Sequence, residues 1–104
     1  MFSSTNLFPL SQNQNTNLSF FLSKLKNIEL GCLAYKLIYS GLTKEQTTKA
    51  LSKYMMFLCL IYLYPNTQLV PTQEIDQVWH HHILDTEKYA QDCQILFGHF
   101  VHHF

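Results

Sequence analysis

Residues 43–64, with the sequence TKEQTTKALSKYMMFLCLIYLY, form the stretch that decides the fold. Thr43 and Gln46 fit a capping box, in which each side chain accepts a hydrogen bond from the backbone amide of the other residue. From Tyr54 onward the stretch is apolar on nearly every side, which is typical of a helix buried in the middle of a core. A Pro-Asn pair follows it and ends the helix. We therefore expect one central helix over this whole stretch.

Two shorter helices are expected before the central one. Apolar side chains follow helical spacing in two series, the first beginning at Leu18 and the second at Leu30. Gly31 lies where the two series meet and indicates a bend between two helices. Gly41 is well placed just beyond the end of the second helix, where glycine is the favoured residue.

Two further helices are expected after the central one, forming a C-terminal hairpin. Thr72 is a candidate N-cap for a helix that ends near Leu84. Asp85 is a candidate N-cap for the next helix, which runs to about Phe97, where Gly98 breaks it. Since no strand-like alternation of useful length occurs, the predicted fold is an all-α bundle of four or five helices.

The length of 104 residues suits a single domain. Residues 1–17 contain the polar run SQNQNTN, and we expect them to form a disordered or loosely packed arm. Residues 18–104 are then one helical domain. The longest apolar run, residues 54–64, is far shorter than the roughly 20 residues that a membrane span needs, so no span is expected.

The charge pattern excludes some classes of partner. The formal net charge is zero, and all seven basic residues are Lys, whereas nucleic-acid-binding proteins usually carry a basic excess and use Arg. We therefore expect no nucleic-acid partner. Charged residues make up only 13% of the chain, about half the usual share, so the surface is rather apolar. This favours a protein partner or self-association through apolar surface.

The cysteines and the N-terminus predict a cytoplasmic location. The three cysteines are widely spaced and include no CxxC pair, which favours free thiols in a reducing compartment. The first residues lack the positive segment and the long apolar run of a signal peptide.

The chemistry-bearing residues gather in the last third of the chain. All six histidines and five of the seven acids follow residue 70. On a helical wheel, Val78, Trp79 and His82 share the apolar face, whereas Asp76 and His80 lie together at its edge, four residues apart. If the next helix folds back tightly on this one, we expect Asp92 and Cys93 of that helix, and His99 or His103 of the tail after it, to approach this edge.

One hypothesis is a divalent metal site. Asp76 and His80 supply two ligands from one helical turn, and His82, Cys93 and His103 are the candidates for completing the set. Mixed nitrogen and oxygen ligands suit zinc or iron, and a cysteine ligand favours zinc.

Two other hypotheses stay open at this point. The chain fits equally a non-enzymatic protein-interaction module, in which the His, Asp and Cys residues form a structural network of packing and hydrogen bonds. It also fits an enzyme in which His80 acts as general base, oriented by Asp76, beside a concave pocket.

The pattern I75-D76-x-x-W79-H80-x-H82-x-L84, followed by Y89-x-x-D92-C93, resembles a family signature. It is similar to that of the glycine-rich domain-containing protein-like family, of which small bacterial members share the upstream apolar helix. The signature covers roughly residues 70–98. Thr86 stands where the plant members tend to have Pro, and the chain has only three Gly, so the glycine-rich region is absent. The resemblance implies that the signature residues form one structural unit, without implying a reaction.

Overall fold

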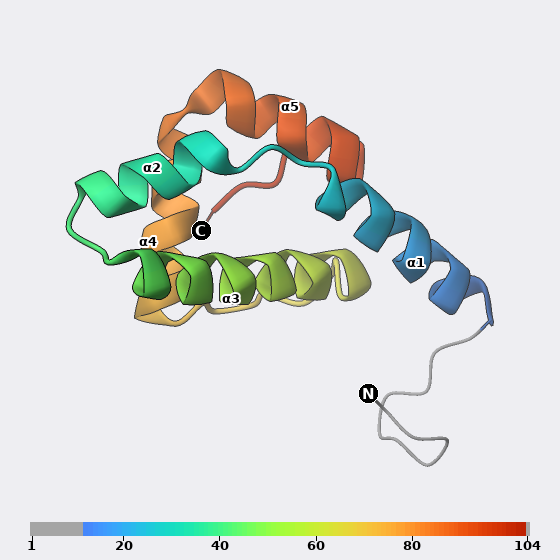
Figure 1. Ribbon diagram of the computed structural model, residues 1–104. Coiled ribbons are helices and arrows are strands. Elements are labelled where there is room, and N and C mark those ends of the chain that lie inside the picture. Colours follow the sequence, from blue (N-terminus) through green and yellow to red (C-terminus); the bar gives the residue numbers. More distant parts are fainter. Residues whose placement is uncertain (1–11, 104) are drawn as a thin grey trace, which may run out of the picture.

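The computed structural model describes the backbone of residues 12–103 and the side chains of residues 17–103. The described part contains five helices: α1 (Gln12–Lys26), α2 (Gly31–Tyr39), α3 (Lys44–Leu63), α4 (Gln73–Leu84) and α5 (Thr86–Phe97) (Figure 1). No strand occurs between residues 12 and 103, so the all-α prediction is confirmed for that part. No helix in this range is both long enough and apolar enough to cross a membrane.

The central helix forms as its capping residues predict. The Thr43 hydroxyl accepts a hydrogen bond from the Gln46 amide (3.0 Å), and the Gln46 side chain accepts one from the Thr43 amide (2.8 Å). These two bonds satisfy backbone amides that a helix start leaves without partners. The apolar half of α3 buries Tyr54, Phe57 and Leu58. The core is therefore built around α3, which contacts α1, α2 and α4.

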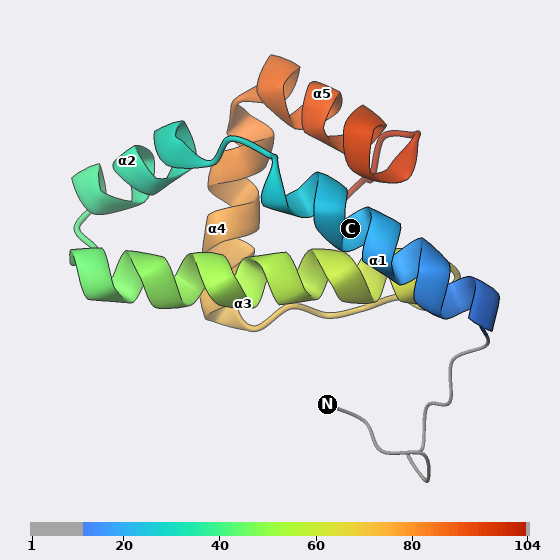
Figure 2. The ribbon, with the colours of Figure 1, turned by 45° about the vertical axis from the view of Figure 1, so that its right-hand side comes forward.

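The other helices surround α3 in two levels. Figure 2 shows α1 and α2 passing over α3, whereas α4 rises from the level of α3 to the level of α5. The hairpin of α4 and α5 is open, because α5 leaves α4 at a wide angle. Phe21 of α1 joins the levels, since its ring stacks on Tyr62 of α3 (4.4 Å between centroids) and meets Phe97 of α5 (5.5 Å).

Gly98 turns the chain back after α5, as the sequence predicts. Its φ of 77° lies in the left-handed region that favours glycine, and its amide donates to the carbonyls of Cys93 and Gln94. Residues 98–103, which we call the C-terminal strap, then run back towards α4 (Figure 1). The strap brings distant side chains against the signature residues.

One local prediction needs correction, and a second is confirmed in position but not in its side-chain bond. The first helix begins at Gln12, before Leu18, where its apolar series starts. Asp85 occupies the N-cap position of α5, but its side chain makes no capping bond and lies 3.6 Å from the Lys36 ammonium instead. The ion pair to α2 competes with the cap for the same carboxylate. The part of the predicted N-terminal arm that covers residues 1–11 lies outside the described residues.

Candidate functional site

A chain of hydrogen bonds crosses the core from α3 to α5. The Tyr54 hydroxyl lies 2.6 Å from Nδ1 of His82, and Nε2 of His82 lies 2.8 Å from Oδ2 of Asp92. All three residues are buried, with at most 3% of their surface exposed. The Lys88 ammonium completes the chain, at 2.7 and 2.8 Å from the two Asp92 oxygens. We call these four residues the buried network.

Burial fixes the proton positions in the network. It raises the pKa of the Tyr54 phenol, which therefore keeps its proton and donates it to Nδ1 of His82. The proton of a neutral imidazole is then on Nε2, which donates to Asp92. Burial also lowers the pKa of His82, although the hydrogen bond to Asp92 opposes that shift. His82 is thus neutral near pH 7 and uses both ring nitrogens inside the protein.

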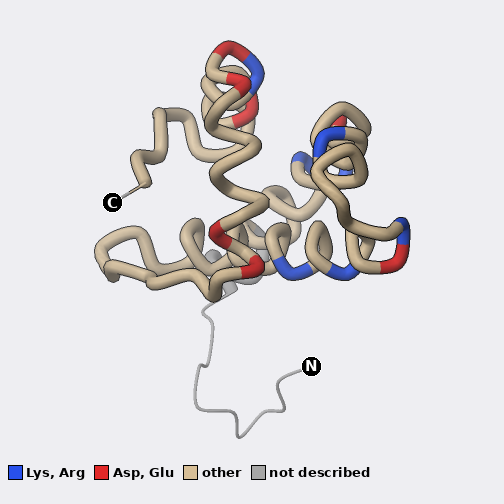
Figure 3. Tube along the Cα trace, turned by 90° about the vertical axis from the view of Figure 1, so that its left-hand side faces the viewer, with Lys and Arg blue, Asp and Glu red and all other residues tan. Residues whose placement is uncertain are grey.

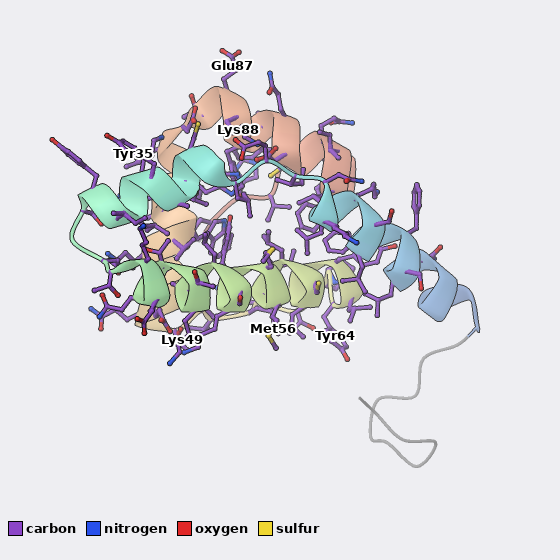
Figure 4. All side chains as sticks on the ribbon, in the orientation of Figure 1. Tyr35, Lys49, Met56, Tyr64, Glu87 and Lys88 are labelled. Atoms are coloured by element: carbon purple, nitrogen blue, oxygen red, sulfur yellow. The ribbon has the colours of Figure 1, made fainter. Side chains whose placement is uncertain are left out.

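The charge of Asp92 is balanced from its own helix. Lys88 lies four residues earlier, one turn away, and its side chain is partly exposed. Figure 4 shows Glu87 pointing away from the body of the molecule, whereas its neighbour Lys88 lies on the inner side of α5. A buried carboxylate with a paired cation and a second donor is the arrangement that makes burial tolerable.

A second set of contacts holds the C-terminal strap. The Trp79 indole donates to the Tyr89 hydroxyl (2.9 Å), which donates in turn to the backbone carbonyl of Val101 (2.6 Å). The His103 ring stacks on Trp79 (4.1 Å between centroids), and its Nε2 contacts the Asp76 carboxylate. The strap is therefore fixed by both the edge and the face of Trp79.

The five predicted metal ligands do not converge. Asp76 is paired with His103, His82 is held within the buried network, and His80 is exposed with its ring near that of His81. Cys93 is buried in the core, where burial raises the pKa of its thiol. Among the described residues, no three His, Cys, Asp or Glu side chains are grouped so that they could hold a metal ion.

The order Tyr–His–Asp in the buried network has the form of a proton relay, but its position argues against catalysis. Tyr54 is 0% exposed, so no substrate can reach its hydroxyl without the core opening. The predicted orientation of His80 by Asp76 is absent too, because the Asp76 carboxylate faces His103. The arrangement is suited to positioning helices rather than to moving protons on a substrate.

Three members of the network, Tyr54, Lys88 and Asp92, are not among the five predicted ligands, and of these only Asp92 belongs to the signature. The sequence could have indicated Lys88, because it lies four residues before Asp92 on one helix face, the spacing of a helical ion pair. No sequence pattern could have indicated Tyr54, because it lies 28 positions before His82 on a different helix. Asp92 belongs to the signature and is buried, and His82 bonds to side chains through both of its ring nitrogens.

A groove of about 830 Å³ is lined by Trp79 but by none of the four residues of the buried network. Its walls are the last turns of α3, the loop of residues 65–71 and the strap with the end of α5. We call it the aromatic groove, because six Phe, Tyr and Trp rings line it. Neither Asp76 nor His80 lines this groove, so this groove is not the pocket beside that pair that the general-base hypothesis requires.

Comparison with known proteins places most of the chain in one family. No curated protein and no solved structure matches the chain. The family model described as UCP032817-like matches residues 31–104, which include α2 to α5, the buried network and the strap. The match does not name the glycine-rich domain-containing protein-like family, so that resemblance stays a prediction. By the extent of the match, the chain belongs to the UCP032817-like family.

Proposed function

We propose that this domain is a non-enzymatic protein-interaction module whose buried network is structural. The observation that carries the proposal is the state of His82, which is 3% exposed and has both ring nitrogens bonded to protein side chains. A histidine in this state has no nitrogen left for a metal or a substrate. The network ties α3, α4 and α5 together and leaves the surface to make contacts.

The contact surface that we propose is the outer face of α2. Tyr35, Ile38 and Tyr39 are 68%, 40% and 84% exposed, and helical spacing places them on one face. Leu33 and Leu37 of the same helix are buried against the core. Figure 4 shows Tyr35 projecting away from α3. Clustered exposed aromatic side chains are typical of protein-interaction surfaces.

A second copy of this chain is the partner that the charges favour. The formal net charge is zero and charged residues are few, so two copies repel each other weakly. Sedimentation velocity over about a 100-fold range of concentration tests this. We expect the apparent mass to rise with concentration, and the double variant Tyr35→Ser/Tyr39→Ser to abolish the rise.

Met56→Ser is the matched control for this experiment, because Met56 is as exposed as Tyr35 and lies on α3. It should leave the association unchanged. A sedimentation coefficient that is independent of concentration would refute self-association. An equal effect of the Met56 variant would show that nonspecific hydrophobic contacts, rather than the face of α2, cause the self-association.

The metal hypothesis stays a prediction, and metal analysis discriminates between it and the structural network. Protein purified without a His-tag or nickel column should carry far less than one zinc or iron per chain. About one metal per chain, lost in the variants Asp76→Asn and His103→Gln, would overturn the proposal that these side chains serve only structure.

A further inference from the structure

The aromatic groove has the size and the lining of a small-molecule site. Its volume of about 830 Å³ falls within the usual range of roughly 300–1,000 Å³ for such pockets. Rings from α3, α4, α5 and the strap face it, among them Phe57, Trp79 and Phe100. Rings of this kind bind flat apolar surfaces by stacking or by edge-to-face contact.

The charge of the lining restricts the ligand further. No Lys, Arg, Asp or Glu is among the residues that line the groove, whereas the imidazoles of His99 and His102 are. Figure 3 shows the same absence along the strap near the C label and along the loop that leads into α4. A charged ligand would lose hydration here without meeting a carboxylate, an ammonium or a guanidinium group, so a neutral ligand is favoured.

The loop supplies the few polar groups that such a site needs. Asn66, Thr67 and Gln68 line the groove and are exposed, so their side chains can bond a hydroxyl or carbonyl substituent at the rim. An extended peptide fits less well. Each of its residues brings a backbone amide and a carbonyl that require partners, and rings do not provide them.

The strap, which forms one wall of the groove, is held in place by contacts within the protein. The strap is anchored by the bond from Tyr89 to the Val101 carbonyl and by the stack of His103 on Trp79. Phe100 packs edge-on against Tyr89 (5.2 Å between centroids). A wall with these anchors does not need to be ordered when a ligand enters, which favours binding.

From the size of the groove, its aromatic lining without Lys, Arg, Asp or Glu, and the anchored strap, we infer that the aromatic groove binds a neutral, planar aromatic small molecule. The inference does not depend on association through α2, since the residues of the α2 face do not line the groove.

Trp79 makes the inference directly testable, because it lines the groove and is the single Trp of the chain. The probe is N-phenyl-1-naphthylamine, which is neutral, added to the purified full chain at a concentration where it is monomeric. We expect saturable binding at a single site, with quenching of Trp79 fluorescence by energy transfer to the probe. Anilinonaphthalene sulfonate carries the same rings with an added negative charge, and it should bind at least about tenfold more weakly.

Variants locate the site. Phe100→Ala should weaken binding of the neutral probe about threefold to tenfold. Ile95→Ala, which removes an apolar side chain of similar exposure outside the groove, should change it by less than about twofold.

A second pair of variants adds a charge instead of removing a ring. This pair is needed because Phe100→Ala also removes a contact that holds the strap, and a looser strap would by itself weaken binding of the probe. Val70 lines the groove and is 85% exposed, so Val70→Lys should fold normally. It should raise the affinity for the sulfonate about threefold, whereas Leu84→Lys, outside the groove, should not.

The following results would overturn the inference: no saturable binding of the neutral probe, binding without quenching of Trp79, or equal binding of the two probes. Equal responses of Val70→Lys and Leu84→Lys would do the same, because they would place the probe elsewhere.

Discussion

Removal of the Asp92 carboxylate tests most directly whether the buried network is structural. In the variant Asp92→Leu, the Nε2–H of His82 loses its acceptor within a site that is 3% exposed. A buried donor without a partner costs about 1–3 kcal/mol. The Lys88 ammonium also loses its partner, but it is partly exposed and regains water, so it adds about 1 kcal/mol or less. The expected loss is therefore about 1–4 kcal/mol of the free energy of unfolding.

Urea unfolding at pH 7.5 measures this loss through the fluorescence of Trp79, which is buried in the folded chain and exposed on unfolding. A domain of this size has a total stability of about 5–15 kcal/mol, so the variant should still fold and give a complete transition. A loss below about 1 kcal/mol would contradict the assignment of the proton to Nε2 and of a structural role to Asp92.

The triple variant Tyr54→Phe/His82→Leu/Asp92→Leu provides the control for this reasoning. It removes the polar groups together, so no buried donor or acceptor of the network is left alone. Replacement of a buried polar set by apolar groups of similar shape is often close to neutral. We expect the triple variant to be more stable than Asp92→Leu. If the triple variant is less stable than Asp92→Leu, the unpaired Nε2–H of His82 is not the cause of the loss of stability in Asp92→Leu.

Three further predictions follow from individual residues. Burial lowers the pKa of His82 in the folded chain below the ordinary value of 6.5, so on acidification the unfolded chain takes up a proton on this imidazole before the folded chain does. The contribution of His82 to the stability should therefore be constant above about pH 7 and fall below it by up to about 1.4 kcal/mol per pH unit. Urea unfolding at several pH values measures this change. Gly98→Ala should lower the stability by about 1–2 kcal/mol in the same assay, because alanine is strained at a φ of 77°; an unchanged midpoint would contradict the left-handed cap. With a thiol reagent such as dithionitrobenzoate, exposed Cys32 should react rapidly, whereas buried Cys93, whose pKa burial raises, should react only in urea; rapid reaction of both in the folded protein would show that the core opens easily.

The sequence by itself determined where helices form and most of their ends, with the start of α1 as an exception. The capping box at Thr43, the cap at Thr72 and the left-handed Gly98 all depend on residues within a few positions of one another. Helical periodicity also assigned the buried face of α4, where Val78, Trp79 and His82 are buried as predicted. These features are local, because helix hydrogen bonds and side-chain faces repeat every few residues.

The tertiary structure alone decided which signature residues meet. Asp76 and His80 have the spacing of a helical pair, yet the strap brings His103 to Asp76 from 27 positions away. His82 could have faced a carbonyl, a metal or another side chain, and the crossing of α3 and α4 selects Tyr54. The angles between helices and the path of the chain after Gly98 determine these side-chain contacts. They are set by the packing of whole faces, and periodicity along one helix carries no information about them.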